Sequence, residues 1–181
     1  MAKTVLVTGG AASGKSRWAA TYFSGCDYVL YLRTGEEVDK DTMKRIDYDN
    51  KTNLVEWDIK TDVYKDPAGL FTDHKFVIFD DLTDYTNAVI NEMCPDIEKI
   101  TYDLTKEIEK KIIGDVTAMF DSIKEIDGSM VIVTMEPGFS VTPENIAHRT
   151  FRDILGGVNQ RIANMSDEVF LSASGIQFRI K

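Results

Sequence analysis

An eight-residue segment near the N-terminus combines glycine, lysine and serine at a spacing that binds phosphate. Residues 9–16 read GGAASGKS and fit G-x-x-x-x-G-K-[ST] at every fixed position. Gly9 and Gly14 permit backbone angles that turn successive N–H groups toward an anion. Lys15 would bring positive charge to the β- and γ-phosphates, and the Ser16 hydroxyl would ligate Mg²⁺. We predict that a nucleoside triphosphate contacts Gly9, Gly10, Ala11, Ala12, Ser13, Gly14, Lys15 and Ser16.

An acidic pair after an apolar run could complete a metal site with Ser16. Residues 76–79 are apolar, and Asp80 and Asp81 follow them directly. In P-loop proteins the second metal carboxylate stands at the end of such a strand. Asp80 is therefore our first choice as metal carboxylate, and Asp81 is the second. The alternative is that one of the two only caps the following helix.

A catalytic base has three candidates in the sequence. An acceptor hydroxyl that attacks the γ-phosphate needs a carboxylate to orient it or to take its proton, while Lys15 stabilises the transferred charge. Asp80 and Asp81 are two candidates. Glu136 is the third, because it follows an apolar run at residues 130–134, at the edge where doubly wound sheets bind ligands. For Glu136 the alternative is a solvated loop acid, and the sequence leaves the choice open.

The elements that must position these residues follow an α/β pattern, in which short apolar runs alternate with amphipathic segments. We predict strands at residues 3–8, 28–32, 76–79, 130–134, 168–171 and 177–180. We predict helices at residues 16–23, 39–50, 83–93, 96–126 and 143–165. Thr142 is the expected N-cap of the last helix, with Pro143 in its first position. These elements predict a doubly wound, mostly parallel sheet with a C-terminal hairpin, in a single nucleotide-binding domain over residues 1–181.

Composition and charge exclude several classes of function. The net charge of -9 argues against nucleic acid as a partner, because binding its phosphates requires clustered Lys and Arg. No run reaches the roughly 18 apolar residues that a membrane span needs. Cys26 and Cys94 match no metal-ligand spacing and are interpreted as reduced thiols, so we expect a cytoplasmic protein.

Five segments together resemble a known enzyme family. They read VTGGAASGKS (7–16), FDDLTDYTN (79–87), VTMEPGFSVTPEN (133–145), FRDILGGVNQRIA (151–163) and DEVFLSASGIQFRIK (167–181). In this order they resemble the bifunctional adenosylcobinamide kinase/adenosylcobinamide-phosphate guanylyltransferase family of cobalamin biosynthesis. The resemblance implies a RecA-like P-loop fold that often assembles as a trimer. It also implies nucleotide contacts at Arg33, Thr34 and Gly35, although arginine is not the usual residue at position 33.

The same resemblance implies two reactions on a corrinoid. The first phosphorylates the hydroxyl of adenosylcobinamide with ATP or GTP, and the second transfers GMP from GTP onto that phosphate through a guanylylated histidine. The position of that histidine is Asp49 here, and the chain's two histidines are His74 and His148. A carboxylate would form a far more labile anhydride and would repel the triphosphate. We therefore expect the kinase half to be kept and the guanylyl-transfer half to be weak or absent.

Further departures from the family leave the acceptor open. An Arg-Pro pair of the family is Asn53-Leu54 here, a Glu is Thr61, and the usual Arg of the P-loop is Ala12. One alternative is a kinase paralogue that acts on another small-molecule acceptor. Another is a non-catalytic nucleotide-binding regulatory protein, although the intact P-loop lysine and serine count against it. The sequence does not decide between ATP and GTP.

Polar side chains stud the predicted helix at residues 143–165. One interpretation is that they contact the substrate or a neighbouring subunit, and the other is that they form a solvated face. The residues in question are Arg149, Arg152, Asn159, Gln160 and Arg161.

Overall fold

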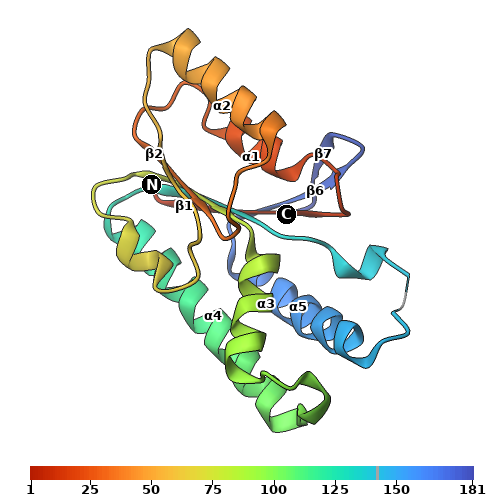
Figure 1. Cartoon of the computed structure of the whole chain (residues 1–181). Coiled ribbons are helices and arrows are strands. Elements are labelled where there is room, and N and C mark those ends of the chain that lie inside the picture. Colours follow the sequence, from red (N-terminus) through yellow and green to blue (C-terminus); the bar gives the residue numbers. More distant parts are fainter. Residues whose placement is uncertain (142) are drawn as a thin grey trace.

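Among the described residues, seven strands form one sheet. The structure is a computed structural model, and it describes residues 1–141 and 143–181 (Figure 1). The strands are β1 (Lys3–Gly9), β2 (Val29–Arg33), β3 (Asp58–Lys60), β4 (Phe76–Asp80), β5 (Ser129–Val133), β6 (Glu168–Ala173) and β7 (Ile176–Arg179). They lie in the order β3-β2-β4-β5-β1-β6-β7. Every neighbouring pair is parallel except β6 and β7, which form an antiparallel hairpin. The expected mostly parallel sheet with a C-terminal hairpin is confirmed.

Helices cover both faces of this sheet, as expected for a doubly wound fold. They are α1 (Lys15–Tyr22), α2 (Lys40–Asn53), α3 (Leu82–Met93), α4 (Tyr102–Glu125) and α5 (Ile146–Met165). Figure 1 shows α1 and α2 on one face and α3, α4 and α5 on the other. Three short 3-10 turns lie in the connections, namely η1 (Pro67–Leu70), η2 (Ile97–Lys99) and η3 (Pro137–Phe139).

Alternating strand side chains build a separate apolar core on each face. In β1, Val5 and Val7 belong to the core that includes Ala19 of α1, whereas Leu6 belongs to the core that includes Ile154 of α5. Leu6 is 1% exposed and both valines are fully buried. A parallel strand covered on both faces requires such a continuous apolar run. The strand that leads into the phosphate loop is therefore held rigidly on both sides.

Two elements differ from the sequence prediction, the strand β3 and the helix α4. β3 was not predicted, because its three residues, Asp58–Lys60, carry no apolar run and pair with β2 at the edge of the sheet. The helix predicted at residues 96–126 is in fact a 3-10 turn followed by α4, which begins at Tyr102. Thr101 caps α4, because its hydroxyl accepts a hydrogen bond from the Leu104 N–H at 3.2 Å. The hydrophobic periodicity continued across this break and concealed it.

The start of α5 also differs from the prediction. The helix begins at Ile146 rather than at Pro143, because Asn145 is the residue that caps it. The Asn145 side chain accepts hydrogen bonds from the N–H groups of Ala147 at 2.7 Å and His148 at 3.3 Å. The predicted cap, Thr142, lies outside the described residues.

Candidate active site

The strand–loop–helix unit at the N-terminus shapes the predicted phosphate loop. β1 ends at Gly9 and α1 begins at Lys15, so the loop lies at the carboxyl edge of the sheet. The φ angles of Gly9, Ala12 and Gly14 are 156°, 53° and 91°. A Cβ added to Gly9 would lie 2.3 Å from the carbonyl oxygen of Ser172. The glycine that the motif specifies at this position is therefore also required by packing.

The C-terminal hairpin holds the phosphate loop from the other side. The Ser13 carbonyl oxygen accepts hydrogen bonds from the Ser172 hydroxyl at 2.7 Å and from the Gly175 N–H at 3.0 Å. A Cβ on Gly14 would lie 3.3 Å from the Gly175 Cα. The sequence predicted the hairpin but not its support of the phosphate loop, since no local pattern links residues so far apart in the chain.

Asp80 lies at the end of β4 and is held by groups from two elements, α1 and β2. Its Oδ1 accepts a hydrogen bond from the Ser16 hydroxyl at 3.0 Å, and its Oδ2 accepts one from the Tyr31 hydroxyl. The guanidinium of Arg33 lies 3.6 Å from Oδ1. Burial raises the pKa of Asp80, while the Tyr31 hydrogen bond, Arg33 and Ser16 each lower it. Sequence reasoning missed Tyr31, because a tyrosine inside a buried strand looks like an ordinary core residue.

Lys15 and Asp81 line the same pocket as Asp80. The Lys15 ammonium donates a hydrogen bond to the Gly10 carbonyl oxygen at 2.7 Å, and burial lowers its pKa against the attraction of Asp81 and Asp80. The Asp81 carboxylate accepts the Asp84 N–H at 2.8 Å and thus caps α3, which was the alternative considered for it. Burial raises the pKa of Asp81 to about 6, although the Asp84 hydrogen bond opposes the shift. Capping uses one of its oxygens, Oδ1.

Of the three residues 33–35 at the end of β2, Arg33 is the one that lines a pocket with the phosphate-loop residues Lys15 and Ser16. Its guanidinium donates to the Asp80 carbonyl oxygen at 3.2 Å and pairs with the Asp84 carboxylate at 3.2 Å. Thr34 is fully buried, and its hydroxyl exchanges hydrogen bonds with the backbone of Asp81. The Gly35 carbonyl oxygen accepts the N–H of Asp62, and Gly35 does not line the pocket that contains Lys15 and Asp80. Thr34 and Gly35 therefore hold the backbone at the carboxyl edge of the sheet, whereas Arg33 lines the pocket that contains Lys15, Ser16 and Asp80.

Two adjoining pockets surround the phosphate loop. One has a volume of about 490 Å³ and is lined by Lys15, Ser16, Arg33, Asp80 and Asp81, among others. The second, of about 540 Å³, shares Lys15 and Ser16 and extends past Gly14 to Arg17, Thr42 and Gly175. The residues predicted to bind phosphate (Lys15) and metal (Ser16 and Asp80) thus line one pocket together with Arg33.

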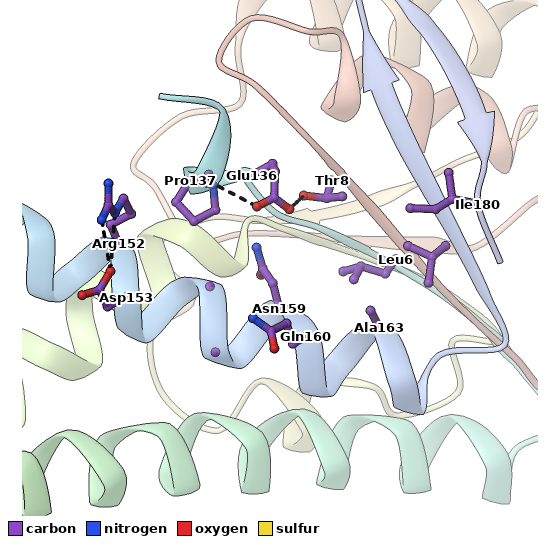
Figure 2. A pocket seen from close by; sticks show the side chains of 14 residues that line it. Leu6, Thr8, Glu136, Pro137, Arg152, Asp153, Asn159, Gln160, Ala163 and Ile180 are labelled. Carbon is purple, nitrogen blue, oxygen red and sulfur yellow. Dashed lines mark hydrogen bonds and ion pairs between the residues drawn. The ribbon is translucent and has the colours of Figure 1, made fainter. Parts of the chain in front are cut away.

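Glu136 lies in a different pocket, on the α5 side of the sheet. Its carboxylate accepts a hydrogen bond from the Thr8 hydroxyl at 3.3 Å (Figure 2). Its N–H donates to the Gly9 carbonyl oxygen at 2.9 Å. This pocket has a volume of about 540 Å³ and lies between the sheet and α5. Met135, the preceding residue, lines the nucleotide-side pocket. The structure therefore brings Glu136 beside the phosphate loop but not into the space shared by Asp80 and Asp81.

Asp49 occupies a buried structural position in α2. It is 4% exposed, and its carboxylate accepts hydrogen bonds from the Ser24 hydroxyl and, at 2.9 Å, from the Gly25 N–H. Arg45 lies 3.8 Å from the same carboxylate. These contacts lie beyond the C-terminal end of α1, whereas Lys15 begins that helix. Eight helical residues span about 12 Å, which separates Asp49 from the phosphate loop.

The polar residues of α5 divide into several groups. Asn159 is buried and bonds to the Thr134 hydroxyl and the Met135 carbonyl oxygen, so it holds the end of β5. Arg149 donates to the carbonyl oxygens just before the helix. Arg152 and Gln160 line the Glu136 pocket, whereas Arg161 is exposed and does not line it.

Two further kinds of site are missing from the part of the chain that the structure describes. No cluster of three or more His, Cys, Asp or Glu side chains there could hold a metal ion by itself. No helix within those residues is long and apolar enough to span a membrane.

The strand order and the loop define the class of protein, a P-loop nucleotide-binding fold of RecA-like type. Two solved structures share it: a prototypical ATPase from the type III secretion system of pathogenic bacteria (TM-score 0.58) and the ATP synthase subunit NeqB from Nanoarcheaum equitans (TM-score 0.51). Each is 11% identical and matches 93% of this chain, which spans 50% and 45% of their respective lengths. At this identity the likeness shows the fold alone.

The chain belongs to the cobinamide kinase / cobinamide phosphate guanyltransferase family, whose model matches residues 5–180. It is 30% identical over 188 residues to the bifunctional adenosylcobalamin biosynthesis protein CobU of Salmonella typhimurium, covering 98% of this chain and 99% of the relative. CobU of Escherichia coli K12 is 29% identical over 98% and 99% of the two chains. CobP of Pseudomonas aeruginosa is 23% identical over 97% and 96%. The resemblance inferred from the sequence is confirmed.

Proposed function

We propose that the protein is a Mg²⁺-dependent kinase that transfers the γ-phosphate of ATP or GTP to the hydroxyl of adenosylcobinamide, within a single domain over residues 1–181. One observation carries the proposal. The Ser16 hydroxyl lies 3.0 Å from the Asp80 carboxylate, and both line one pocket with Lys15. Membership of the family supplies the acceptor.

Triphosphate binding would rest on the loop at residues 9–16 and the N-terminus of α1. Backbone N–H groups there would donate hydrogen bonds to phosphate oxygens. The Lys15 ammonium would leave the Gly10 carbonyl oxygen, to which it donates here, and bind phosphate oxygens instead. Ser16 and Asp80 fit Mg²⁺, because hydroxyl and carboxylate oxygens are the hard ligands that this ion prefers. A bound Mg²⁺ would neutralise the charge on the β- and γ-phosphate oxygens. Arg33 would exchange its half-exposed partner, Asp84, for a phosphate oxygen.

In the transfer step, the acceptor hydroxyl oxygen forms a bond to the γ-phosphorus as the bond to the β–γ bridging oxygen breaks. The nucleoside diphosphate leaves with that electron pair, and the hydroxyl proton passes to a carboxylate. We assign this role to Asp81, which lines the pocket and has a pKa raised to about 6, near the working pH. Asp80 has both oxygens occupied by Ser16 and Tyr31, which suits a metal carboxylate. We assign Glu136 to the acceptor side, because it lines the pocket between the sheet and α5 and not the one that contains Asp80 and Asp81.

The guanylyl-transfer half of the family activity is proposed to be weak or absent. Asp49 stands at the position of the family histidine, and its carboxylate is engaged by Ser24 and Gly25. A buried carboxylate that accepts two hydrogen bonds is a poor nucleophile. The distance along α1 also separates it from the phosphate loop.

We further propose a cytoplasmic homo-oligomer, a trimer as in the family. The apolar side chains Ile176 and Phe178 support an interface, because they are 60% and 54% exposed on the edge strand β7. Cys26 and Cys94 are unpaired thiols, which suits a reducing compartment.

The test is a reaction of the purified protein with Mg²⁺, adenosylcobinamide and either ATP or GTP, followed by mass spectrometry of the corrinoid and of the intact protein. Lys15→Ala serves as the control for contaminating kinases. A phosphorylated corrinoid, without a GMP adduct on the protein, is the expected result. A GMP adduct or a GDP-linked corrinoid would refute the loss of guanylyl transfer. Nucleotide binding with an unchanged corrinoid would refute the kinase proposal and favour another acceptor or a regulatory role.

A further inference from the structure

We propose that the pocket between the sheet and α5 binds one edge of the corrinoid acceptor, with Gly156 keeping it open. This is the pocket of about 540 Å³ that contains Thr8 and Glu136 (Figure 2). The inference names the acceptor site of the kinase proposed above and rests on that function.

The position of the pocket suits an acceptor. Met135 lines the space that holds Lys15 and Asp80, and the next residue, Glu136, lines the α5-side pocket. The Glu136 N–H also bonds to the carbonyl oxygen of Gly9, the first residue of the phosphate loop. A ligand in the pocket is thus separated from the nucleotide space by one short segment of backbone. A flexible arm that carries a hydroxyl can pass over that segment.

A pair of helical glycines indicates that the space is preserved. Glycine inside a helix costs about 1 kcal/mol relative to alanine. Packing explains Gly157, because a Cβ there would lie 3.2 Å from the Glu109 carboxylate. Gly156 has no such explanation, since a Cβ there would meet no atom within 4 Å. Gly156 lines the pocket, so the missing side chain enlarges the pocket and does not relieve a clash.

The chemistry of the walls suits a corrinoid edge, which alternates methyl groups with uncharged amides. One end of the pocket is apolar, with Leu6 and Ile180, and the other carries Arg152 and Asp153 (Figure 2). Carboxylates accept from amide N–H groups, and a guanidinium donates to amide oxygens. Two carboxylates, those of Glu136 and Asp153, and one guanidinium, that of Arg152, line the pocket. This balance disfavours a second phosphate-bearing ligand and favours a neutral one.

The experiment compares Gly156→Phe with two matched variants. Gly156→Ala adds a Cβ where there is room and leaves most of the pocket open. Gly114→Phe makes the same large substitution at an exposed helical glycine of α4 that also meets no atom within 4 Å and does not line the pocket. The measurements are the KM for adenosylcobinamide and for ATP, and direct adenosylcobinamide binding by equilibrium dialysis without nucleotide.

We expect Gly156→Phe to raise the corrinoid KM and dissociation constant at least tenfold, while the KM for ATP stays within twofold. Gly114→Phe should match the wild type in all three quantities, whereas Gly156→Ala should weaken corrinoid binding by less than Gly156→Phe does. A Gly156→Phe protein with unchanged corrinoid binding would overturn the pocket assignment and leave the kinase proposal intact. A tenfold loss in Gly114→Phe as well would also overturn it, since the effect would not depend on the pocket. A wild type that neither binds nor phosphorylates adenosylcobinamide would overturn both.

Discussion

Tyr31→Phe tests whether the buried hydroxyl of β2 orients the metal carboxylate. The substitution removes only the hydrogen bond to Asp80 Oδ2 and leaves Ser16 and Arg33 in contact with Oδ1. Both partners are buried, with Tyr31 fully so and Asp80 2% exposed. A buried hydrogen bond to a charged group contributes about 1.5–3 kcal/mol. At about 2–4 °C for each kcal/mol in a chain of this length, the melting temperature should fall by about 3–12 °C.

The same hydrogen bond lowers the pKa of Asp80 against burial, which raises it. Its removal raises this pKa further and disfavours the charged form. The loss of stability should therefore be largest at pH values above the pKa of Asp80, and it should shrink as the pH falls and Asp80 becomes protonated. Because a protonated or misoriented carboxylate binds Mg²⁺ poorly, the Mg²⁺ concentration for half-maximal nucleotide binding should rise by about fivefold, which corresponds to about 1 kcal/mol.

Tyr85→Phe provides the matched control. Tyr85 is equally buried, and its hydroxyl donates to the Asp115 carboxylate at 2.8 Å, between α3 and α4 and away from the phosphate loop. Asp115 keeps its ion pair with Lys111, so the cost should be smaller, about 1 kcal/mol. The two variants, Tyr31→Phe and Tyr85→Phe, are compared by melting curves from pH 5 to 9 and by Mg²⁺ titrations of nucleotide binding. If Tyr31→Phe leaves the Mg²⁺ titration unchanged, Tyr31 is only a core residue and the reasoning is refuted.

Three further substitutions test the site and its supports. Asp49→Ala removes the acceptor for the turn after α1 and should lower the free energy of unfolding by about 2–3 kcal/mol in urea, with corrinoid phosphorylation per folded molecule unchanged. Lost phosphorylation at full stability would contradict this structural role. Gly9→Ala places a Cβ 2.3 Å from the Ser172 carbonyl oxygen and should weaken nucleotide binding at least tenfold. An unchanged dissociation constant would contradict the close approach of Gly9 to Ser172. Hydrogen bonds from Thr4 hold the pKa of Asp167 below its usual range, so the carboxylate stabilises the fold at neutral pH and loses this effect as the pH falls through that pKa. The difference in melting temperature between wild type and Asp167→Asn should therefore be largest near neutral pH and vanish in acid, and a constant difference would contradict the assignment.

Local patterns were sufficient for most of the fold. The buried strands are apolar runs, and the phosphate loop depends on residues that are consecutive in the chain. Asp80 was predictable for the same reason, since a carboxylate directly after an apolar strand must stand at the carboxyl edge of the sheet. β3 was missed because its pairing depends on its backbone and on the neighbouring strand, and its side chains show no apolar pattern.

The residues that sequence reasoning missed act through partners distant in the chain. Tyr31 of β2 contacts Asp80 of the neighbouring strand β4, and Ser172 contacts Ser13 although the two lie near opposite ends of the sequence. Neither pair has a fixed spacing that a motif could record. The position of Asp49 was identified from family resemblance, but its hydrogen bonds to the turn after α1 became visible only when the two helices were placed side by side.

The tie between the phosphate loop and the C-terminal hairpin has a consequence for biosynthesis. β1 emerges first from the ribosome, yet its neighbours in the sheet, β5 and β6, come late, and the contacts of Ser13 require residues 172–175. Contacts of such long sequence separation form slowly, because the closure entropy of the intervening chain must first be overcome. A growing chain therefore contains the complete phosphate-binding sequence long before the contacts that hold the loop in its folded conformation can form. Nucleotide affinity should appear only after residues 172–175 have been synthesised, so that shorter nascent chains do not sequester ATP or GTP.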